Sequence, residues 1–415
     1  MLALRPIRAH VPARALCFSC VLALLTLLVA CSDSDTDPAV PTDRSFVIGQ
    51  IIISPEGFSS FAGFTSTLEE DGTVEIADSV ELPGLSGVVA GTRPGSFLVN
   101  SGLAPEVFRF DVDEAGAITQ AGPVSFAGRG SAITGNPPVI VPVEESKAYY
   151  LDINQLLGFT FDPNTLTITG EFPLDGFETP STEFPVGDFA GDPLRRGEFM
   201  YLTAAYRNLD DGTGAPLARV LRINVTTDEF TVIDDTRCPL TTRLVEGTDG
   251  YIYTASDALH GAAVLARPEA NAPSCVLRLI DDGTRFDPDF RVFFSELVGV
   301  EGAGSLIPGP DGEAYFLAYD ESVAPPAATQ NEIAGTPAWR TYRMTLGDAP
   351  TATRIDELPL RSTGGVSPGR VGSAYYDNIV SADFSQTTLY RTDRSPTPER
   401  SITFPGLLGG ISDLR

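Results

Sequence analysis

Histidine and cysteine, the residue types that most often carry acid–base catalysis and metal binding, are scarce in this sequence. The 415 residues include two histidines and five cysteines. One histidine precedes a segment that resembles the core of a signal peptide, so His260 is the histidine expected in the mature protein. No G-x-S-x-G nucleophile elbow accompanies it, and we interpret His260 as a loop residue. The sequence therefore predicts no Ser-His-Asp triad, no zinc or haem site of the usual type, and no cofactor.

Carboxylates are abundant, but they do not single out a site. The chain has 55 Asp and Glu against 28 Lys and Arg, a formal net charge of −27. At this density, pairs of acids suited to glycoside hydrolysis arise by chance. Residues 111–116, DVDEAG, resemble the start of a calcium loop but lack its completion, so a hairpin turn is the simpler interpretation. The acidic balance argues against nucleic acid as a partner, because phosphate binding needs a basic surface.

The N-terminus predicts where the protein works. Residues 1–14 are basic, and residues 15–30 form an apolar run that is short for a spanning helix but suits a signal peptide. The tetrapeptide LVAC that ends at Cys31 resembles the bacterial lipobox, in which the cysteine is acylated and the leader is removed. Acyl chains anchor a domain because each buried CH₂ contributes about 0.8 kcal/mol. The alternative is an ordinary signal peptide with a cysteine placed there by chance.

The residues after the lipobox predict a tether and an address. Residues 31–45 are polar and contain proline, so we expect a flexible, lipid-bearing segment. Serine, and not aspartate, follows Cys31, which under the sorting rule of well-studied Gram-negative bacteria favours the outer membrane. The expected organisation is a leader (1–30), a tether (31–45) and a folded domain (46–415).

Two cysteines are left for the folded domain, Cys238 and Cys275. An oxidising envelope favours a disulfide between them. Closing a loop over their separation of 37 residues would stabilise the fold by about 4 kcal/mol in the loop-entropy model. Two buried free thiols are the alternative.

A repeated unit predicts the fold. Residues 46–404 are a succession of short β-branched and aromatic runs broken by Gly, Pro, Asp and Asn, which indicates an all-β fold. One strand of the unit aligns, at intervals of 44 to 65 residues, on Thr65, Arg109, Thr160, Arg222, Arg278, Arg343 and Arg391. Seven units of about 50 residues predict a seven-bladed β-propeller with four strands per blade.

The ring is expected to close through the C-terminus. The first unit has no innermost strand of its own, because the tether comes directly before residue 46. Residues 402–413, ITFPGLLGGISD, resemble residues 80–91, VELPGLSGVVAG, which would open the second unit. We therefore expect residues 402–413 to complete the first blade and to cover strand edges that would otherwise be exposed.

Five of the seven units carry arginine at the same mid-strand position. One interpretation is a ring of guanidinium groups that binds an anion. The other is that each guanidinium pairs with a carboxylate between blades while its stem packs along the sheet. A mid-blade strand lies away from the axis of a propeller, so we favour the structural interpretation.

A second set of arginines lies where propellers bind ligands, on loops that flank the innermost strands around the axis. These residues come from five different units and are Arg93, Arg129, Arg195, Arg243 and Arg370. A positive funnel on an acidic body would attract a small anion. We take these five arginines as the candidate ligand-binding residues and expect no metal site.

The lipobox, the acidic tether and the hairpin motifs FRFD (108–111), FTFDP (159–163) and DG-Y-Y together resemble a loose group of bacterial lipoproteins. The group includes the MxcI-like proteins found beside siderophore genes. The resemblance covers most of the mature chain and implies siderophore or iron handling, with no iron-ligand set to transfer. We expect a membrane-anchored scaffold that binds a small anionic ligand or an envelope protein. The alternative is an enzyme, a hydrolase or lyase that uses loop carboxylates or arginines.

Overall fold

The computed structural model describes residues 44–415 apart from 56, 70–71, 134–137, 209–212, 365–368 and 395–396. The described residues belong to one unit of the chain, Pro38–Arg415. The predicted leader, Cys31 and nearly all of the predicted tether lie outside them. No helix in the described part of the chain is both long and apolar enough to cross a membrane.

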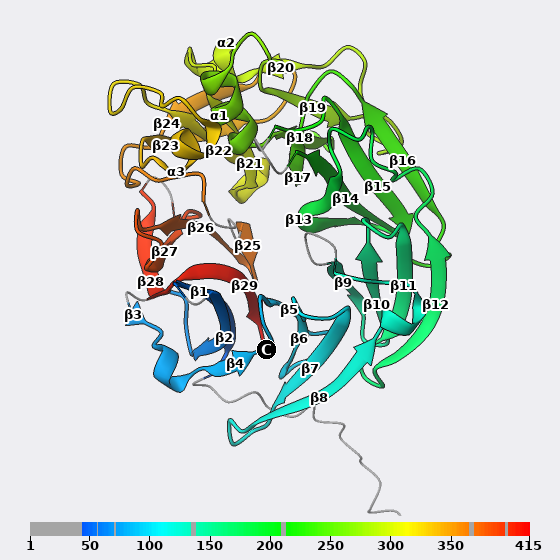
Figure 1. Ribbon diagram of the computed structural model, residues 1–415. Coiled ribbons are helices and arrows are strands. Elements are labelled where there is room, and N and C mark those ends of the chain that lie inside the picture. Colours follow the sequence, from blue (N-terminus) through cyan, green and yellow to red (C-terminus); the bar gives the residue numbers. More distant parts are fainter. Residues whose placement is uncertain are drawn as a thin grey trace, which may run out of the picture. The chain divides into compact units, whose positions relative to one another are not determined.

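Seven antiparallel sheets form the blades of a β-propeller, which confirms the predicted fold class (Figure 1). From the innermost strand outward, blade 1 contains β29 (Leu407–Asp413), β1 (Phe46–Ser54), β2 (Gly57–Thr65) and β4 (Val80–Leu82). Blade 2 contains β5 (Gly87–Ala90), β6 (Ser96–Asn100), β7 (Glu106–Val112) and β8 (Ile118–Ser125). Blade 3 contains β9 (Val139–Glu144), β10 (Lys147–Asp152), β11 (Leu157–Asp162) and β12 (Thr167–Pro173).

The other four blades repeat this order. Blade 4 contains β13 (Val186–Arg196), β14 (Phe199–Arg207), β15 (Ala218–Asn224) and β16 (Phe230–Asp235). Blade 5 contains β17 (Thr241–Glu246), β18 (Ile252–Ser256), β19 (Cys275–Leu279) and β20 (Val292–Phe293). Blade 6 contains β21 (Ala303–Pro308), β22 (Ala314–Tyr319), β23 (Trp339–Thr345) and β24 (Thr351–Arg354). Blade 7 contains β25 (Gly369–Val371), β26 (Ala374–Val380), β27 (Gln386–Arg391) and β28 (Glu399–Pro405).

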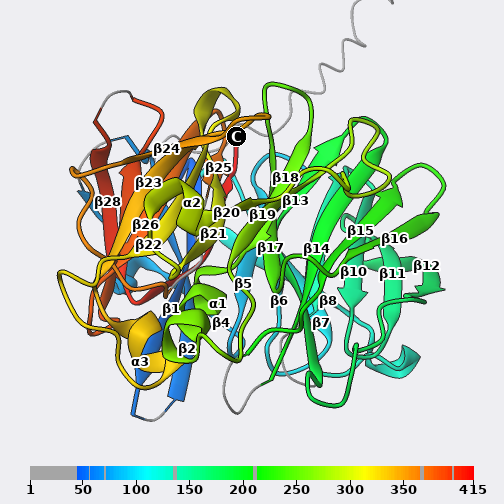
Figure 2. The same cartoon turned by 90° about the horizontal axis from the view of Figure 1, so that it is seen from above.

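The two ends of the ring carry different connections. We call "connection face" the end that holds the turns between second and third strands and the segments that lead from one blade to the next. The helices and 3₁₀ turns are α1 (Ala258–Ala266), α2 (Phe294–Val298), α3 (Gln330–Gly335), η1 (Ile76–Asp78), η2 (Ala127–Arg129) and η3 (Pro310–Gly312). Helices α1 and α3 are insertions on the connection face. The C-terminus and the start of β1 lie at the opposite face, since Phe46 pairs with Asp413 (Figure 2).

The C-terminal strand closes the ring, as predicted. Strand β29 pairs with β1 in an antiparallel register and supplies the innermost strand of blade 1. The connection from β2 to β4 of blade 1 also contributes a strand to blade 7. This strand, β3 (Gly72–Thr73), pairs in parallel with β28 of blade 7. Blade 1 therefore receives its innermost strand from the end of the chain, and blade 7 receives β3 from the blade 1 segment. The inner edge of β1 is covered by β29.

The boundary of the closing strand differs from the prediction. Residues 402–405 belong to β28, the outermost strand of blade 7, and only residues 407–413 form β29. Gly406 separates them at φ 75°, in the left-handed region that favours glycine. The look-alike stretch 80–91 is divided in the same way at a Pro-Gly pair. The repeated motif is thus an outermost strand, a turn and the next innermost strand.

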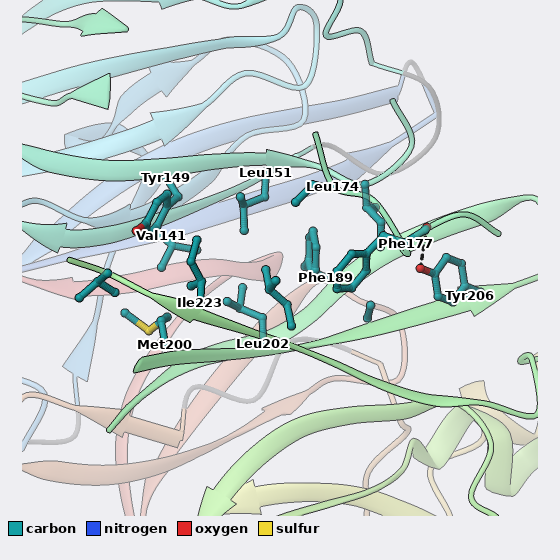
Figure 3. Packing of buried hydrophobic residues seen from close by; sticks show 14 of the residues in the cluster. Val141, Tyr149, Leu151, Leu174, Phe177, Phe189, Met200, Leu202, Tyr206 and Ile223 are labelled. Atoms are coloured by element: carbon teal, nitrogen blue, oxygen red, sulfur yellow. Dashed lines mark hydrogen bonds between the residues drawn. The ribbon is translucent and has the colours of Figure 1, made fainter. Parts of the chain in front are cut away.

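Alternating strand residues fill the seams between blades. Between blades 3 and 4, Val141 and Leu151 pack with Met200, Leu202 and Ile223 (Figure 3). Each large apolar side chain buried in this way contributes about 1.5–3 kcal/mol. Seams of this kind hold the innermost strands in place around the axis.

Mid-strand arginines also join blades. The contacts with the following blade are Arg109 with the carbonyls at 163–164, Arg278 with Asp348 at 2.7 Å, and Arg391 with Glu69 at 2.6 Å. This is the structural role that the sequence favoured. Arg222 and Arg343 differ, because they contact residues of their own blades. Arg222 donates to the Tyr201 hydroxyl at 3.2 Å, and Arg343 pairs with Glu313 at 3.8 Å. These clamps lie on third strands, away from the axis.

A disulfide joins Cys238 and Cys275 within blade 5, and their Cα atoms are 5.6 Å apart. Both residues are fully buried. Cys238 comes just before the innermost strand β17, and Cys275 begins the third strand β19. The bond therefore ties the segment that enters blade 5 to the middle of its sheet.

Candidate functional site

A cavity of about 590 Å³ lies on the axis, in the half of the ring nearest to the connection face. Its wall comes from β13, β17, β21 and β29, the ends of second strands, and the segment between blades 6 and 7. The large apolar residues of the wall are Ile51, Phe189, Leu240, Leu259, Leu317, Leu407 and Leu408. Its polar side chains belong to Asp188, Arg207, Thr242, Arg243, Asp257, Ser305, Arg361 and Thr363. This volume and mixed lining are typical of a small-molecule site.

Each of the four innermost strands in this wall has a β-bulge. A residue at positive φ lies in each bulge, namely Gly191 (79°), Arg243 (62°), Ser305 (64°) and Gly410 (121°). Gly191 is required for a second reason, because a Cβ there would lie 2.6 Å from Cγ of Arg243. Arginine and serine in this region cost about 1–2 kcal/mol each. Bulges redirect side chains, so these four shape the wall of the cavity.

Asp188 and Arg207 face each other on neighbouring strands of blade 4. Arg207 Nη2 lies 3.7 Å from Asp188 Oδ2, which is beyond hydrogen-bond distance. Within the described part of the chain, the buried Nε of Arg207 has no acceptor. Desolvation raises the pKa of Asp188 to about 6, although the positive charge of Arg207 opposes the shift. A carboxyl and a guanidinium with unused hydrogen-bonding capacity therefore lie side by side in the cavity wall.

Arg361 is the most deeply buried charge of the wall. Its Nη1 lies 2.5 Å from Oδ1 of Asp377, and both side chains are 1% exposed. Its backbone N–H and carbonyl pair with those of Trp339, which fixes the connecting segment to β23. Among the described residues, Nη2 of Arg361 and Oδ2 of Asp377 have no hydrogen-bond partner. This ion pair joins blades 6 and 7 behind the cavity.

Asp257 connects three elements at the cavity. Its Oδ1 accepts the backbone N–H of Leu259 at 2.8 Å and so caps α1. Its Oδ2 accepts hydrogen bonds from the hydroxyls of Thr242 at 2.8 Å and Ser305 at 3.1 Å. Because both oxygens are occupied, we interpret Asp257 as a residue that holds β17, β21 and α1 together.

Arg243 is the predicted ligand-binding residue that the structure places in the cavity wall. Its backbone N–H donates to Oγ1 of Thr203 in blade 4 at 3.1 Å. Asp192 is exposed to solvent at its surface, but many protein atoms surround it. The resulting desolvation raises the pKa of its carboxyl, and the positive charge of Arg243 opposes this rise. Arg243 thus has an acidic residue within its electrostatic reach.

The other four predicted arginines do not line the cavity. Arg93, Arg195 and Arg370 lie at turns between first and second strands, on the face opposite the connection face, and Arg129 lies between blades 2 and 3. The guanidinium group of Arg93 contacts Asp111, and that of Arg129 contacts Glu171. The guanidinium groups of Arg195 and Arg370 donate to the backbone carbonyls of Gly197 and Gly372. The structure therefore brings one member of the predicted set to the axis and leaves the others apart.

His260 is not in a loop, which corrects the interpretation from the sequence. It lies in α1, is 1% exposed, and one ring nitrogen contacts the carbonyl of Ala272 at 2.8 Å. Desolvation lowers its pKa, so it is a neutral residue of the helix packing. Within the described residues, no group of three or more His, Cys, Asp and Glu is placed to hold a metal ion.

The connection face is also the more apolar end of the ring. The large apolar side chains that are exposed in the described part of the chain all lie there, and they are Ile53, Phe58, Leu85, Leu103 and Val323. Four of them come from blades 1 and 2. Ile53 and Phe58 are register partners on β1 and β2. A contiguous patch of exposed apolar residues is typical of a surface that contacts another molecule.

Sequence reasoning missed Asp188, Arg207 and Arg361. A signal for Arg207 was present, since it is the first charge after the buried run of β14. Asp257 likewise follows the buried run of β18. A charged residue at this place lies at the connection-face end of a second strand. This position in the repeat is the signal that marks Arg207 and Asp257 as candidate residues of the cavity. No comparable signal marks Arg361, which lies in an irregular segment.

Comparison with known proteins supports the fold. No protein-family model and no curated protein matches this chain. A structure of a Lactobacillus plantarum protein is 12% identical over 89% of this chain and 98% of its own, with a TM-score of 0.52. The Pseudomonas aeruginosa periplasmic gluconolactonase is 13% identical over 90% of this chain and 98% of its own, with a TM-score of 0.48. At 12% identity, the likeness to the Lactobacillus plantarum protein shows the fold alone.

Proposed function

We propose that this protein is a binding scaffold of the bacterial cell envelope that holds a small molecule in its axial cavity. The observation that most supports this is the cavity, about 590 Å³ in volume, whose wall combines leucines and other apolar side chains with a few charged ones. The strained backbone at Arg243 and Ser305 adds to it, because such strain concentrates at functional sites.

The proposal includes anchoring in the outer membrane through an acylated Cys31. The described chain enters blade 1 at the face opposite the connection face. An anchor attached there would hold the propeller by that face and leave the axial cavity accessible. The exposed apolar residues of the connection face, Phe58 and Leu103 among them, favour an envelope protein as an additional partner.

A role in siderophore handling is a narrower form of this proposal. It comes from the resemblance to lipoproteins encoded beside siderophore genes, and ferric siderophores therefore belong in any ligand screen. Small anions belong there as well, because Arg207 and Arg243 reach the cavity wall.

An enzyme is the second candidate, and Asp188 is the observation that favours it. Its pKa of about 6, raised by desolvation, would let it exchange a proton near neutral pH. Arg207 beside it would stabilise a developing negative charge. A hydrolase or lyase would lose its turnover on Asp188→Asn, whereas a binding protein would show none to lose.

A thermal-shift screen tests the proposed function. The whole protein would be heated with ferric siderophores, aliphatic carboxylates, sugars and free amino acids. A ligand at 100 times its Kd stabilises the native state by about 2.7 kcal/mol. Leu407→Trp fills the cavity and should abolish the shift, while Leu103→Trp, at a residue 74% exposed on the connection face, should leave it unchanged. A shift that Leu407→Trp does not affect, or no shift with any compound, would contradict the proposal.

A further inference from the structure

The charges of the axial cavity are paired with charges of opposite sign. Arg361 forms an ion pair with Asp377, and Arg207 lies 3.7 Å from Asp188. Asp192 lies within electrostatic reach of Arg243. Asp257 is occupied by the cap of α1 and by two hydroxyl groups. The wall is therefore not a positive funnel. It carries guanidinium and carboxylate groups together, which suits a ligand that carries both signs of charge.

The pair of Arg207 and Asp188 is the one that a ligand would complete. Arg361 and Asp377 are in contact at 2.5 Å and inaccessible. Arg207 and Asp188 are 3.7 Å apart, and their side chains are 26% and 28% exposed. At that distance neither satisfies the other by a direct hydrogen bond. The guanidinium needs an acceptor, and the carboxylate needs a donor.

Ligands with only one charge fit this pair poorly. An anion bound to Arg207 would stand beside the carboxylate of Asp188 in a site where desolvation already disfavours negative charge. A cation bound to Asp188 would face the guanidinium. A group that carries an ammonium and a carboxylate on one carbon would satisfy both residues at once, because its two charges are as close together as theirs.

The remainder of the wall suits an aliphatic or aromatic body. Leu240, Leu259, Leu317 and Leu407 line it, and the volume of about 590 Å³ leaves room for a large side chain. Burying such a side chain against leucines is favourable, because the hydrophobic effect grows with the apolar area removed from water.

We propose that the axial cavity binds a free α-amino acid with a large apolar side chain, its ammonium group on Asp188 and its carboxylate on Arg207. This inference rests on the proposed function and names the ligand class of the same site. It commits the site to a zwitterion, in place of the small anion that the predicted arginines indicated.

Calorimetric titration of the whole protein with three probes tests the inference. The probes are L-phenylalanine, which is a zwitterion, N-acetyl-L-phenylalanine, which is an anion, and L-phenylalanine amide, which is a cation. L-Phenylalanine should bind at least about tenfold more tightly than either derivative, since each derivative loses one charge-assisted contact. Equal or tighter binding of N-acetyl-L-phenylalanine would overturn the inference in favour of an anion site.

Variants assign each contact. Asp188→Asn should weaken L-phenylalanine about tenfold or more. It should tighten N-acetyl-L-phenylalanine, because it removes the negative charge that stands beside the bound anion. Arg207→Gln should weaken L-phenylalanine and N-acetyl-L-phenylalanine. It should tighten the amide, because it removes the positive charge that faces the bound cation. Arg129→Gln is the matched control, because Arg129 pairs with Glu171 away from the cavity. If Asp188→Asn weakens no probe, the inference is wrong. If L-phenylalanine fails while another compound of the thermal-shift screen binds, the inference falls and the proposed function stands.

Discussion

The titration of Asp188 should be measurable in the stability of the whole protein. Desolvation in the cavity wall raises the pKa of its carboxyl from 3.8 to about 6, against the opposing charge of Arg207. The folded state therefore binds the proton more tightly than the unfolded chain does. Stability from this group is fully present below pH 4 and is lost as the pH rises through 6. Asp188→Asn keeps the side chain neutral at every pH and should remove this loss.

The size of the effect follows from the two pKa values. A difference of about 2 between them corresponds to about 3 kcal/mol, since each unit of pKa is worth about 1.4 kcal/mol. The side chain is 28% exposed, so water screens part of the cost and about 2–3 kcal/mol is the expected range. The variant should match the wild type near pH 4 and exceed it by this amount at pH 7.5.

Urea unfolding of both proteins between pH 4 and pH 8 gives the difference directly. Asp320→Asn is a control of opposite sign, because hydrogen bonds from Ser322 and Arg340 hold the pKa of Asp320 near 2. That variant should lose about 2 kcal/mol at neutral pH, and the loss should shrink as the pH falls toward 2. A difference between wild type and Asp188→Asn that stays constant from pH 4 to pH 8 would refute the reasoning.

Three further predictions concern the fold. Deleting residues 407–415 should abolish cooperative urea unfolding, because it uncovers the edge of β1 in blade 1; a single native-like transition would contradict the closure. Asp377→Asn should lower the free energy of unfolding by about 3–5 kcal/mol, because it leaves Arg361 buried without a counter-charge, and adding Arg361→Met should restore most of the loss. The double variant Cys238→Ser, Cys275→Ser should lower the free energy of unfolding by about 4 kcal/mol. Dithiothreitol should lower it by the same amount in the wild type and should have no effect on the variant.

The fold was predictable because its signals are local and repeated. Alternation of apolar residues identifies strands, and the recurrence of the unit gives the number of blades. The resemblance between two Pro-Gly stretches pointed to closure through the C-terminus. The prediction misplaced the start of the closing strand, which begins at residue 407 and not at residue 402. Each stretch spans two strands, and a break at Gly406 is visible only from its left-handed backbone.

The cavity was not predictable in the same way. Arg243 and Ser305 have positive φ, a conformation that these residue types rarely adopt and that no sequence pattern announces. The bulges that contain them change which side chains face the axis. Asp188 and Arg207 are 19 positions apart in the sequence and meet only because β13 and β14 pair in one register. Proximity to an innermost strand was thus a poor guide to proximity to the axis.

The electrostatic surroundings of the arginines bear on the ligand. The chain has 55 acids and 28 bases, and most of the described arginines form an ion pair with a carboxylate. Arginines near the axis therefore do not add up to a positive funnel. A net charge of −27 also repels small anions at long range, except where salt screens it. A zwitterion has no net charge to be repelled, and the paired wall offers it one partner for each end. The same acidity that neutralises the predicted funnel thus favours a dipolar ligand over an anionic one.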